Sequence, residues 1–214
     1  MSAAFPVALA LLTFACGCST LDRLDLGRVL TSGRDGWQHP DRVIAALDLK
    51  PGDRVAEIGA GDGYWLPRLA EAVGAEGRVY AVEVDDDLVA ELEERVAREG
   101  LDNVVVVRGR LEDPGLPDGE IDLAMTCLTY HHIQDRPAYF ERLRVDLKPR
   151  GRVVHLDDRD DAPPPFRWLQ STGHWSDPAS LREEMVVAGY RRVEEFDFLP
   201  LQSFQIFVAE GGGP

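Results

Sequence analysis

Cysteine and basic side chains are scarce in this chain of 214 residues. Its three cysteines, Cys16, Cys18 and Cys127, are too few and too scattered to form a disulfide framework, and the last lies in an apolar, strand-like run. Lysine and arginine total 23 against 38 aspartates and glutamates, which gives a formal net charge of −15. No basic run is dense enough to form a positive face, and an acidic surface repels phosphate backbones. The composition therefore argues against a nucleic-acid partner.

The chain also lacks an apolar run of the ~20 residues that a membrane-spanning helix needs. The nearest approach is 3–18, which matches the apolar core of an export signal in length. The end of this run resembles a bacterial lipoprotein box, in which Cys18 would be acylated after cleavage before it. No Lys or Arg precedes the run, so a poorly ordered leader, or a start site placed too early, remains the alternative.

Beyond residue 40, short apolar strands alternate with helical patterns. The patterns predict strands at 53–58, 78–83, 103–108, 121–126, 152–157, 191–198 and 203–209, and helices at 40–49, 64–74, 86–99, 136–147 and 177–188. Continuous Val, Ile and Leu runs in the early strands are typical of a sheet covered on both faces. We therefore expect an α/β fold with a doubly wound, mostly parallel seven-stranded sheet. Too few residues separate the last two strands for a crossover helix, so they should pair antiparallel.

These patterns also predict how the chain is divided. We expect a signal-like or lipoprotein-like leader at 1–21, a linker or lid at 22–39, the α/β domain at 40–210 and a disordered tail at 211–214.

The first strand runs into a glycine loop, with glycines at alternate positions: Gly59, Gly61 and Gly63. Glycines placed in this way allow a sharp turn, or let a ligand touch the main chain where a Cβ would intrude. Glu57 stands two residues before the first glycine, and Glu83 ends the second strand. A carboxylate at that strand end can accept hydrogen bonds from both hydroxyls of a ribose. Together these features predict a ligand that contains a nucleoside.

A dinucleotide is the first alternative for this ligand. Its fingerprint is G-x-G-x-x-G, but the spacing here is G-x-G-x-G, and Tyr64 takes the last position of the other pattern. A phosphate would also lie near the Glu57 carboxylate, with no Lys or Arg in the loop to offset it. S-adenosylmethionine instead carries an ammonium and a sulfonium beside its ribose, so its charges suit this loop.

The chain resembles class I S-adenosylmethionine-dependent methyltransferases from about Pro40 to Val208. The loop at 56–63 is similar to the first motif of that family, Glu83 to its ribose-binding acid, and 147–152 to the turn before its fifth strand. Within the superfamily, the run at 129–133, with its Tyr-His-His sequence, resembles a bacterial subgroup of small methyltransferases. The cofactor-binding residues that we predict are Glu57, Gly59, Gly61, Gly63, Tyr64, Glu83, Val84, Arg110, Leu111 and Cys127.

One position departs from the family pattern. Arg110 stands where many relatives carry an acid that bonds the adenine amino group. That contact then falls to the Leu111 main chain or to Glu112, or is absent.

The residues just past the fourth strand are the candidates for catalysis. Methyl donor and acceptor should meet at the carboxyl end of this strand, where Tyr130, His131 and His132 follow. A histidine titrates near neutrality and can take a proton from an oxygen or nitrogen nucleophile. Adjacent side chains rarely point the same way, so we expect at most one histidine in the pocket and favour His131. The alternative is that one histidine caps a loop and the other packs against the next helix.

We predict no metal site, although His155 with the carboxylates of the next strand end could hold a divalent ion. The predicted function is methyl transfer from S-adenosylmethionine to a small-molecule oxygen or nitrogen nucleophile. One alternative is a lipid-anchored binding protein that keeps the fold without the reaction; another is a nucleotide-dependent oxidoreductase. Cofactor supply favours a cytoplasmic location, whereas processing at Cys18 would place the protein at a membrane.

Overall fold

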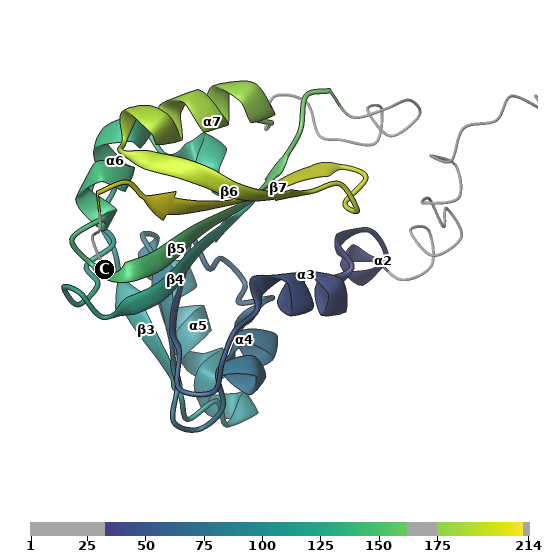
Figure 1. Cartoon of the computed structure of the whole chain (residues 1–214). Coiled ribbons are helices and arrows are strands. Elements are labelled where there is room, and N and C mark those ends of the chain that lie inside the picture. The colour runs from purple at the N-terminus through teal and green to yellow at the C-terminus, as the bar shows by residue number, and fades with distance from the viewer. Residues whose placement is uncertain (1–32, 162–174, 212–214) are drawn as a thin grey trace, which may run out of the picture.

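The computed structural model describes residues 33–161 and 175–211 (Figure 1). The predicted leader, with Cys16 and Cys18, and most of the predicted tail lie outside these residues. No helix within them is long and apolar enough to cross a membrane.

The described residues form one seven-stranded sheet in the order β3-β2-β1-β4-β5-β7-β6. Its strands are β1 (Arg54–Ile58), β2 (Arg78–Glu83), β3 (Val104–Arg108), β4 (Ile121–Cys127), β5 (Leu147–Asp158), β6 (Tyr190–Phe196) and β7 (Gln202–Ala209). Of these strands, β7 alone runs in the opposite direction to the others, so it pairs antiparallel with both β5 and β6. The predicted doubly wound sheet and its antiparallel final pair are confirmed.

Helices cover both faces of the sheet (Figure 1). They are α2 (Arg34–Gln38), α3 (Pro40–Leu47), α4 (Leu66–Val73), α5 (Asp86–Glu99), α6 (Arg136–Leu143) and α7 (Pro178–Val187). The N-terminus of α5 shows how locally these elements are fixed. The Asp85 carboxylate accepts hydrogen bonds from the main chain of Asp87 and Leu88, and Gly100 ends the helix in a left-handed conformation.

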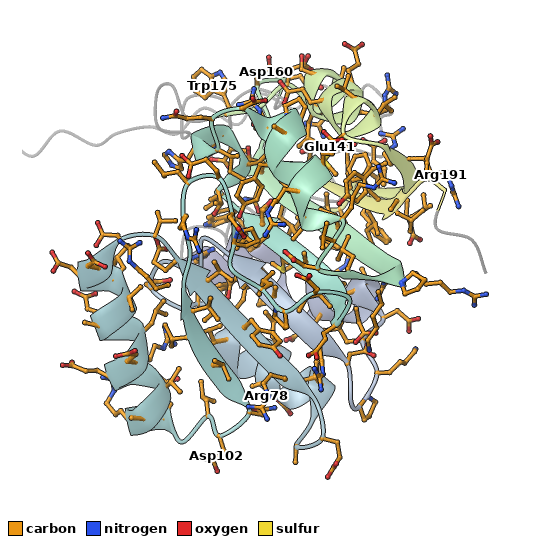
Figure 2. All side chains as sticks on the ribbon, turned by 90° about the vertical axis from the view of Figure 1, so that its left-hand side faces the viewer. Arg78, Asp102, Glu141, Asp160, Trp175 and Arg191 are labelled. Carbon is orange, nitrogen blue, oxygen red and sulfur yellow. The ribbon has the colours of Figure 1, made fainter. Side chains whose placement is uncertain are left out.

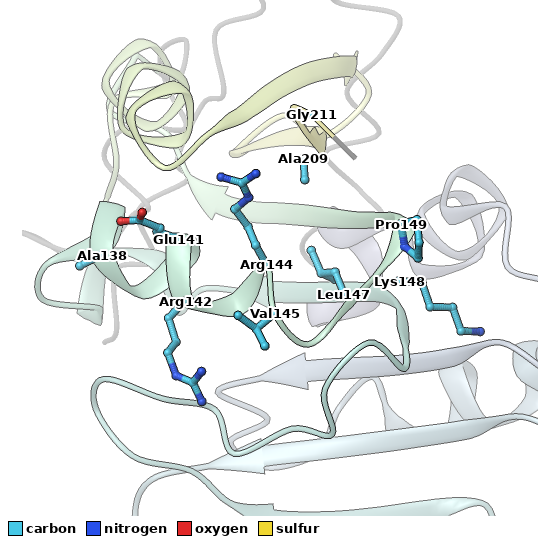
Figure 3. A pocket seen from close by; sticks show the side chains of 10 residues that line it. All are labelled: Ala138, Glu141, Arg142, Arg144, Val145, Leu147, Lys148, Pro149, Ala209 and Gly211. Carbon is cyan, nitrogen blue, oxygen red and sulfur yellow. The ribbon is translucent and has the colours of Figure 1, made fainter. Parts of the chain in front are cut away.

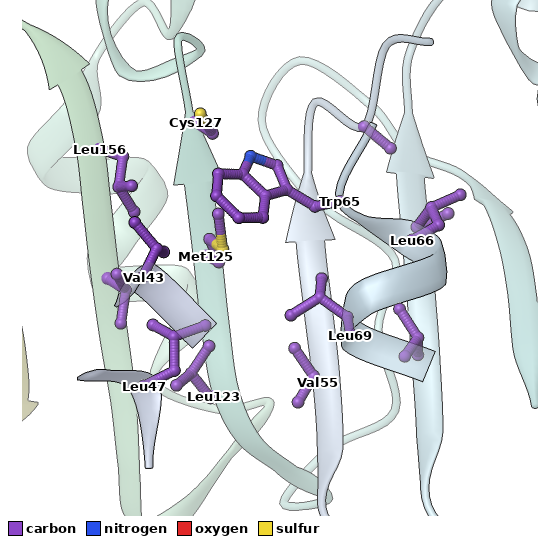
Figure 4. Close-up of a cluster of buried hydrophobic side chains, with 14 of the residues drawn as sticks. Val43, Leu47, Val55, Trp65, Leu66, Leu69, Leu123, Met125, Cys127 and Leu156 are labelled. Atoms are coloured by element: carbon purple, nitrogen blue, oxygen red, sulfur yellow. The ribbon is translucent and has the colours of Figure 1, made fainter. Parts of the chain in front are cut away.

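Each face of the sheet buries its own hydrophobic cluster. One joins α3, α4 and α5 to the sheet, and Figure 4 shows Trp65 within it, beside Met125 and Cys127 of β4. Trp65 is fully buried in the cluster that also holds Val43 and Leu47 of α3. The second cluster packs α6 and α7 against the other face. Because β1, β2, β4 and β5 are parallel neighbours, their carboxyl ends lie at the same edge of the sheet.

The structure corrects two predicted boundaries. The predicted helix at 136–147 ends at Leu143, because Leu147 already pairs with Ile121 of β4. Residues 147–152, which resemble the turn before the family's fifth strand, lie inside β5, and the register between β4 and β5 shifts between Ile121 and Leu123. The predicted linker at 22–39 also contains a helix, α2, in its described part.

Candidate active site

The glycine loop after β1 has two different steric environments. Gly59, Gly61 and Gly63 all have positive φ angles, of 73°, 53° and 75°. A Cβ on Gly59 would lie 2.4 Å from Thr129 Cγ2, so this glycine is required for packing against the end of β4. A Cβ on Gly61 would meet nothing within 4 Å. The main chain at Gly61 therefore borders open space, as a ligand-binding loop requires.

Glu83 lies across this loop at the end of β2. Its Oε2 accepts a hydrogen bond of 3.0 Å from the Gly61 N–H. Its Oε1 accepts bonds of 2.7 and 3.2 Å from the main chain of Val84 and Asp85. Three main-chain donors thus hold the carboxylate in one orientation, and the remaining lone pairs can accept from a diol.

Glu57 is buried beneath the same loop, with 2% of its surface exposed. Its Oε2 has no hydrogen-bond partner among the described residues. Burial raises its pKa to about 8; the charge of Arg34 opposes this shift, and those of Asp62 and Glu83 add to it. A buried acid without a partner at a ligand-binding loop is poised for a cationic group, whose charge would compensate for the cost of burial.

The chain is strained where β4 ends. Leu128 has a φ angle of 57°, in the left-handed region that branched side chains rarely adopt. The next residue, Thr129, donates hydrogen bonds from Oγ1 to the main-chain oxygens of Cys127 (3.1 Å) and Gly59 (3.3 Å). This turn joins β4 to the glycine loop and leads directly into the short 3₁₀ helix Tyr130–His132.

His131 pairs with Asp157 of β5. Its Nδ1 lies 3.0 Å from Asp157 Oδ1 and 3.2 Å from Oδ2. The Asp157 side chain is fully buried, and Ser176 Oγ donates to its Oδ2 at 2.5 Å. In the neutral ring, a carboxylate facing Nδ1 selects the tautomer with the proton on Nδ1, which places the lone pair on Nε2. The centroid of the His131 ring also lies 4.1 Å from that of the exposed His132, with the two ring planes tilted by 45°.

Ser176 is the second residue of the described range 175–211. Its N–H donates to the Asp158 main-chain oxygen at 2.8 Å, and it forms a bridge with Arg159. Figure 2 shows Trp175 and Asp160 close together at this end of the molecule, opposite Arg78 and Asp102 at the starts of β2 and β3.

Tyr130, the third catalytic candidate, is buried in the cluster under α6 and α7. Its hydroxyl donates to Glu184 Oε2 at 2.5 Å, and burial with this acid raises its pKa. His155 is also buried, where its Nδ1 lies 2.7 Å from Thr126 Oγ1 and burial lowers its pKa to about 3. The two rings pack against each other, with centroids 4.9 Å apart. No group of three or more His, Cys, Asp and Glu side chains in the described ranges is arranged to hold a metal ion.

The other predicted cofactor residues surround the glycine loop. Val84 and Leu111 are 39% and 61% exposed, and such apolar surfaces near Glu83 suit a flat aromatic base. The main chain of Arg110 pairs with Asp113, which shapes the loop that carries Leu111. Tyr64 donates from its hydroxyl to Asp35 Oδ1 of α2 at 2.5 Å. The Cys127 thiol is buried, and burial raises its pKa.

A hollow of about 640 Å³ lies elsewhere, between the end of α6 and the start of β5 (Figure 3). Its basic side chains are already engaged. Arg142 pairs with Asp113 at 2.7 Å, Lys148 with Asp122 at 2.6 Å, and Arg144 donates to the Glu210 main chain at 2.9 Å. This hollow lies at the opposite edge of the sheet from the glycine loop, so it is not part of the candidate site.

Two site residues were missed from the sequence. Arg34 reaches the end of β4 from α2, with Nη2 3.5 Å from Cys127 Sγ. Gln38 is fully buried and donates to Cys127 Sγ at 3.2 Å and to Gln202 Oε1 at 2.9 Å. Only the Trp-Gln pair before Pro40 hinted at a buried segment there.

Comparisons with known proteins agree with this site geometry. Residues 55–151 match the family model described as methyltransferase domain. The demethylmenaquinone methyltransferase of Geobacillus kaustophilus is 27% identical over 115 residues, which cover 54% of this chain and 49% of that protein. Nocamycin O-methyltransferase of Saccharothrix syringae is 30% identical over 112 residues, which cover 52% of this chain and 40% of that protein. The chain thus spans less than half the length of these curated relatives.

A solved structure, the SAM dependent methyltransferase from Aquifex aeolicus, superimposes with a TM-score of 0.69 at 26% identity. The match covers 79% of this chain and 88% of that one. The match to the family model includes the glycine loop, Glu83 and the 3₁₀ turn with His131. Residues 55–151 are therefore similar to a methyltransferase domain, and the fold is that of a solved SAM-dependent methyltransferase, a likeness that fits S-adenosylmethionine as the cofactor.

Proposed function

We propose that this protein transfers the methyl group of S-adenosylmethionine to a small molecule, at an oxygen or nitrogen atom. The observation that carries the proposal is the placement of two carboxylates on either side of the open main chain at Gly61. Glu83 is oriented by that N–H, and Glu57 lies buried below with an unpartnered oxygen. This arrangement fits the cofactor. Glu83 can accept hydrogen bonds from the ribose hydroxyls, Glu57 can pair with a cationic group, and the main chain at Gly61 borders open space.

The same observation argues against a dinucleotide. A phosphate placed at this loop would lie close to two carboxylates, and burial of like charges is costly. An ammonium group would instead lower the cost of ionising Glu57, whose pKa is raised to about 8 without a ligand.

His131 is the proposed general base. Bound S-adenosylmethionine would supply a methyl carbon that accepts an electron pair from the acceptor while the carbon–sulfur bond breaks and its electrons stay on sulfur. His131 Nε2 takes the proton that the acceptor oxygen or nitrogen loses. Asp157 accepts a hydrogen bond from Nδ1–H at 3.0 Å, an arrangement that places the lone pair of the ring on Nε2. A positioned base contributes about 10²–10⁴-fold to a rate when the nucleophile starts protonated.

A hydroxyl is the favoured acceptor. The relative Nocamycin O-methyltransferase is named for an oxygen acceptor, and a hydroxyl with its proton in place needs a base such as His131. The finer assignment to a Tyr-His-His subgroup rests on residues 130–132 and stays part of this proposal.

The experiment is a transfer assay with tritiated S-adenosylmethionine and a panel of phenols, quinols and amines. We expect label in at least one acceptor, and a fall of about 10²-fold or more with His131→Ala. An Arg42→Gln variant, altered at an exposed position on α3, is the control. The proposal is contradicted if the wild type shows no binding of S-adenosylhomocysteine, or if His131→Ala transfers label at the wild-type rate.

We also propose that the leader anchors the protein to a membrane through acylation of Cys18. Support comes from the sequence of residues 3–18 alone. Cells grown with a clickable fatty acid should label the wild type but not Cys18→Ser, and equal labelling of the two would end the idea.

A further inference from the structure

Side chains of the short helix α2, which precedes α3 in Figure 1, make hydrogen bonds to three other parts of the fold. Gln38 joins it to the end of β4 at Cys127 and to the start of β7 at Gln202. Asp35 joins it to the glycine-loop region, because Tyr64 and Arg68 both donate to its carboxylate, at 2.5 and 3.0 Å. These contacts place the side chain of Arg34 in a fixed position over the β1 and β4 ends.

The Arg34 guanidinium lies between the glycine loop and β4. Its central carbon is 3.9 Å from the centroid of the Tyr64 ring, and Nη2 is 3.5 Å from Cys127 Sγ. Its charge acts on the carboxyl of Glu57, whose pKa it lowers against the effect of burial. The Arg34 guanidinium and the Glu57 carboxyl therefore act on the same region.

The contacts that Arg34 makes with the described residues leave much of its binding capacity unused. A guanidinium has five N–H donors in a planar fork that matches a carboxylate. Nε donates to Gln38 Oε1 at 2.5 Å, while the thiol at 3.5 Å is a weak acceptor. In the described part of the chain, the carboxylate paired with Arg34 is that of Asp62, 3.8 Å away with a side chain that is 75% exposed. That distance is too long for a hydrogen bond.

We infer that Arg34 binds the carboxylate of the donor's methionyl group, opposite Glu57, which takes the ammonium. The inference rests on the proposed function, because it assigns one more residue to the same cofactor site. An α-amino acid group carries a carboxylate and an ammonium on one carbon, so it complements a guanidinium and a buried carboxyl that face one region. Arg34 is then a specificity residue that selects the intact amino acid, and Tyr64 acts as its support.

The arrangement has a consequence for ligand choice. A ligand that keeps the ammonium but lacks the carboxylate should depend on Glu57 and be indifferent to Arg34. A ligand that lacks the whole amino acid group should be indifferent to both. Charge-assisted hydrogen bonds of this kind correspond to about a 10- to 100-fold change in affinity.

The experiment is calorimetry on the full chain with three probes: S-adenosylhomocysteine, S-adenosyl-3-thiopropylamine, which lacks the carboxylate, and 5′-methylthioadenosine, which lacks the amino acid group. We expect Arg34→Gln to weaken the first about 10- to 100-fold and to change the other two less than about threefold. Glu57→Gln should weaken the first two and spare the third. Arg42→Gln, on the neighbouring helix, is the matched control and should change none.

Each other outcome has a distinct meaning. If Arg34→Gln weakens all three probes equally, Arg34 only holds α2 in place and the inference is wrong. If it weakens none, the carboxylate is bound elsewhere and the inference is wrong. Wild-type protein that binds none of the probes would instead contradict the proposed function itself.

Discussion

His131 Nδ1 lies 3.0 Å from Asp157 Oδ1, so a residue of the 3₁₀ turn after β4 is paired with the buried, penultimate residue of β5. The adjacent parallel strands bring the two residues together at the carboxyl edge, and Ser176 holds the far oxygen of Asp157 at 2.5 Å. The pair determines which ring nitrogen carries the proton. Asp157 is thus a positioning residue that acts through His131.

Replacing Asp157 tests this role. Asp157→Asn can present an N–H to Nδ1 and stabilise the wrong tautomer, so we expect kcat to fall about 10²–10⁴-fold with little change in KM. S-adenosylhomocysteine affinity, measured by calorimetry, should stay within about threefold, because Asp157 is not among the proposed cofactor contacts. Asp157→Glu should recover part of the rate. A loss of cofactor affinity equal to the loss of rate would show a structural role instead.

The acidity of the acceptor gives a second test of the base. With His131→Ala, the rate deficit should shrink across a series of substituted phenols as the phenol becomes more acidic, because an acceptor that is already ionised needs no base. Initial rates with tritiated donor measure this trend. A deficit that is the same for every phenol would contradict proton removal by His131.

Gly59 and Gly61 should respond differently to replacement by alanine. Gly59→Ala places a Cβ 2.4 Å from Thr129 Cγ2 at a positive φ angle, so we expect a loss of about 2–4 kcal/mol in the free energy of unfolding. Gly61→Ala meets no neighbour within 4 Å, so it should cost only the strain of a Cβ at a φ angle of 53°, about 1–2 kcal/mol. Because that space belongs to the ligand, Gly61→Ala should still weaken S-adenosylhomocysteine binding at least tenfold. Urea unfolding and calorimetry provide the two measurements, and equal stability losses would contradict the steric account.

The buried Glu57 makes the ligand-free protein less stable at high pH. Its pKa is raised from 4.5 to about 8, so the folded state holds this proton more tightly than the unfolded state does. The stabilisation from the proton is complete below about pH 4.5 and is lost as the pH rises through 8. We therefore expect Glu57→Gln to match the wild type near pH 4.5 and to be more stable by a few kcal/mol above pH 8. Thermal unfolding across this range tests the sign, and a Gln variant that is less stable at pH 8 would contradict it.

Ligand affinity should depend on the same proton. An ammonium favours the ionised form of Glu57, so binding of S-adenosylhomocysteine should tighten as the pH rises from 5.5 to 7.5, by at most about tenfold per unit. Binding of 5′-methylthioadenosine, which has no ammonium, should be flat, as should both ligands with Glu57→Gln. The assignment fails if the two ligands show the same pH profile in the wild type.

The strands and the cofactor loop could be predicted because their signals are local. Valine-rich runs, alternate glycines and an acid at a strand end hold regardless of the rest of the chain, and β2 and α5 have their predicted bounds. α6 is shorter than its pattern, because pairing of Leu147 with Ile121 competes with the helix. Such a competition between distant residues leaves no trace in a local pattern.

The missed and partly predicted site residues depend on tertiary contacts. Residues 34–38 show no helical periodicity, and α2 is fixed by Tyr64, Arg68, Cys127 and Gln202 from other elements. The sequence does not determine whether His131 or His132 points into the site, because the direction of each side chain depends on the 3₁₀ turn. Tyr130 shows the limit most clearly, because its hydroxyl is bonded to Glu184, 54 residues along the chain.

The most direct test of the cofactor site is calorimetry of S-adenosylhomocysteine with Glu83→Gln. The amide keeps the size of the side chain but removes the charge that accepts from the ribose hydroxyls, so we predict affinity about 10- to 100-fold weaker than wild type. Glu93→Gln, at an exposed position on α5, should bind like the wild type. Wild-type affinity in a folded Glu83→Gln variant, or no binding by the wild type, would contradict the assignment of this site.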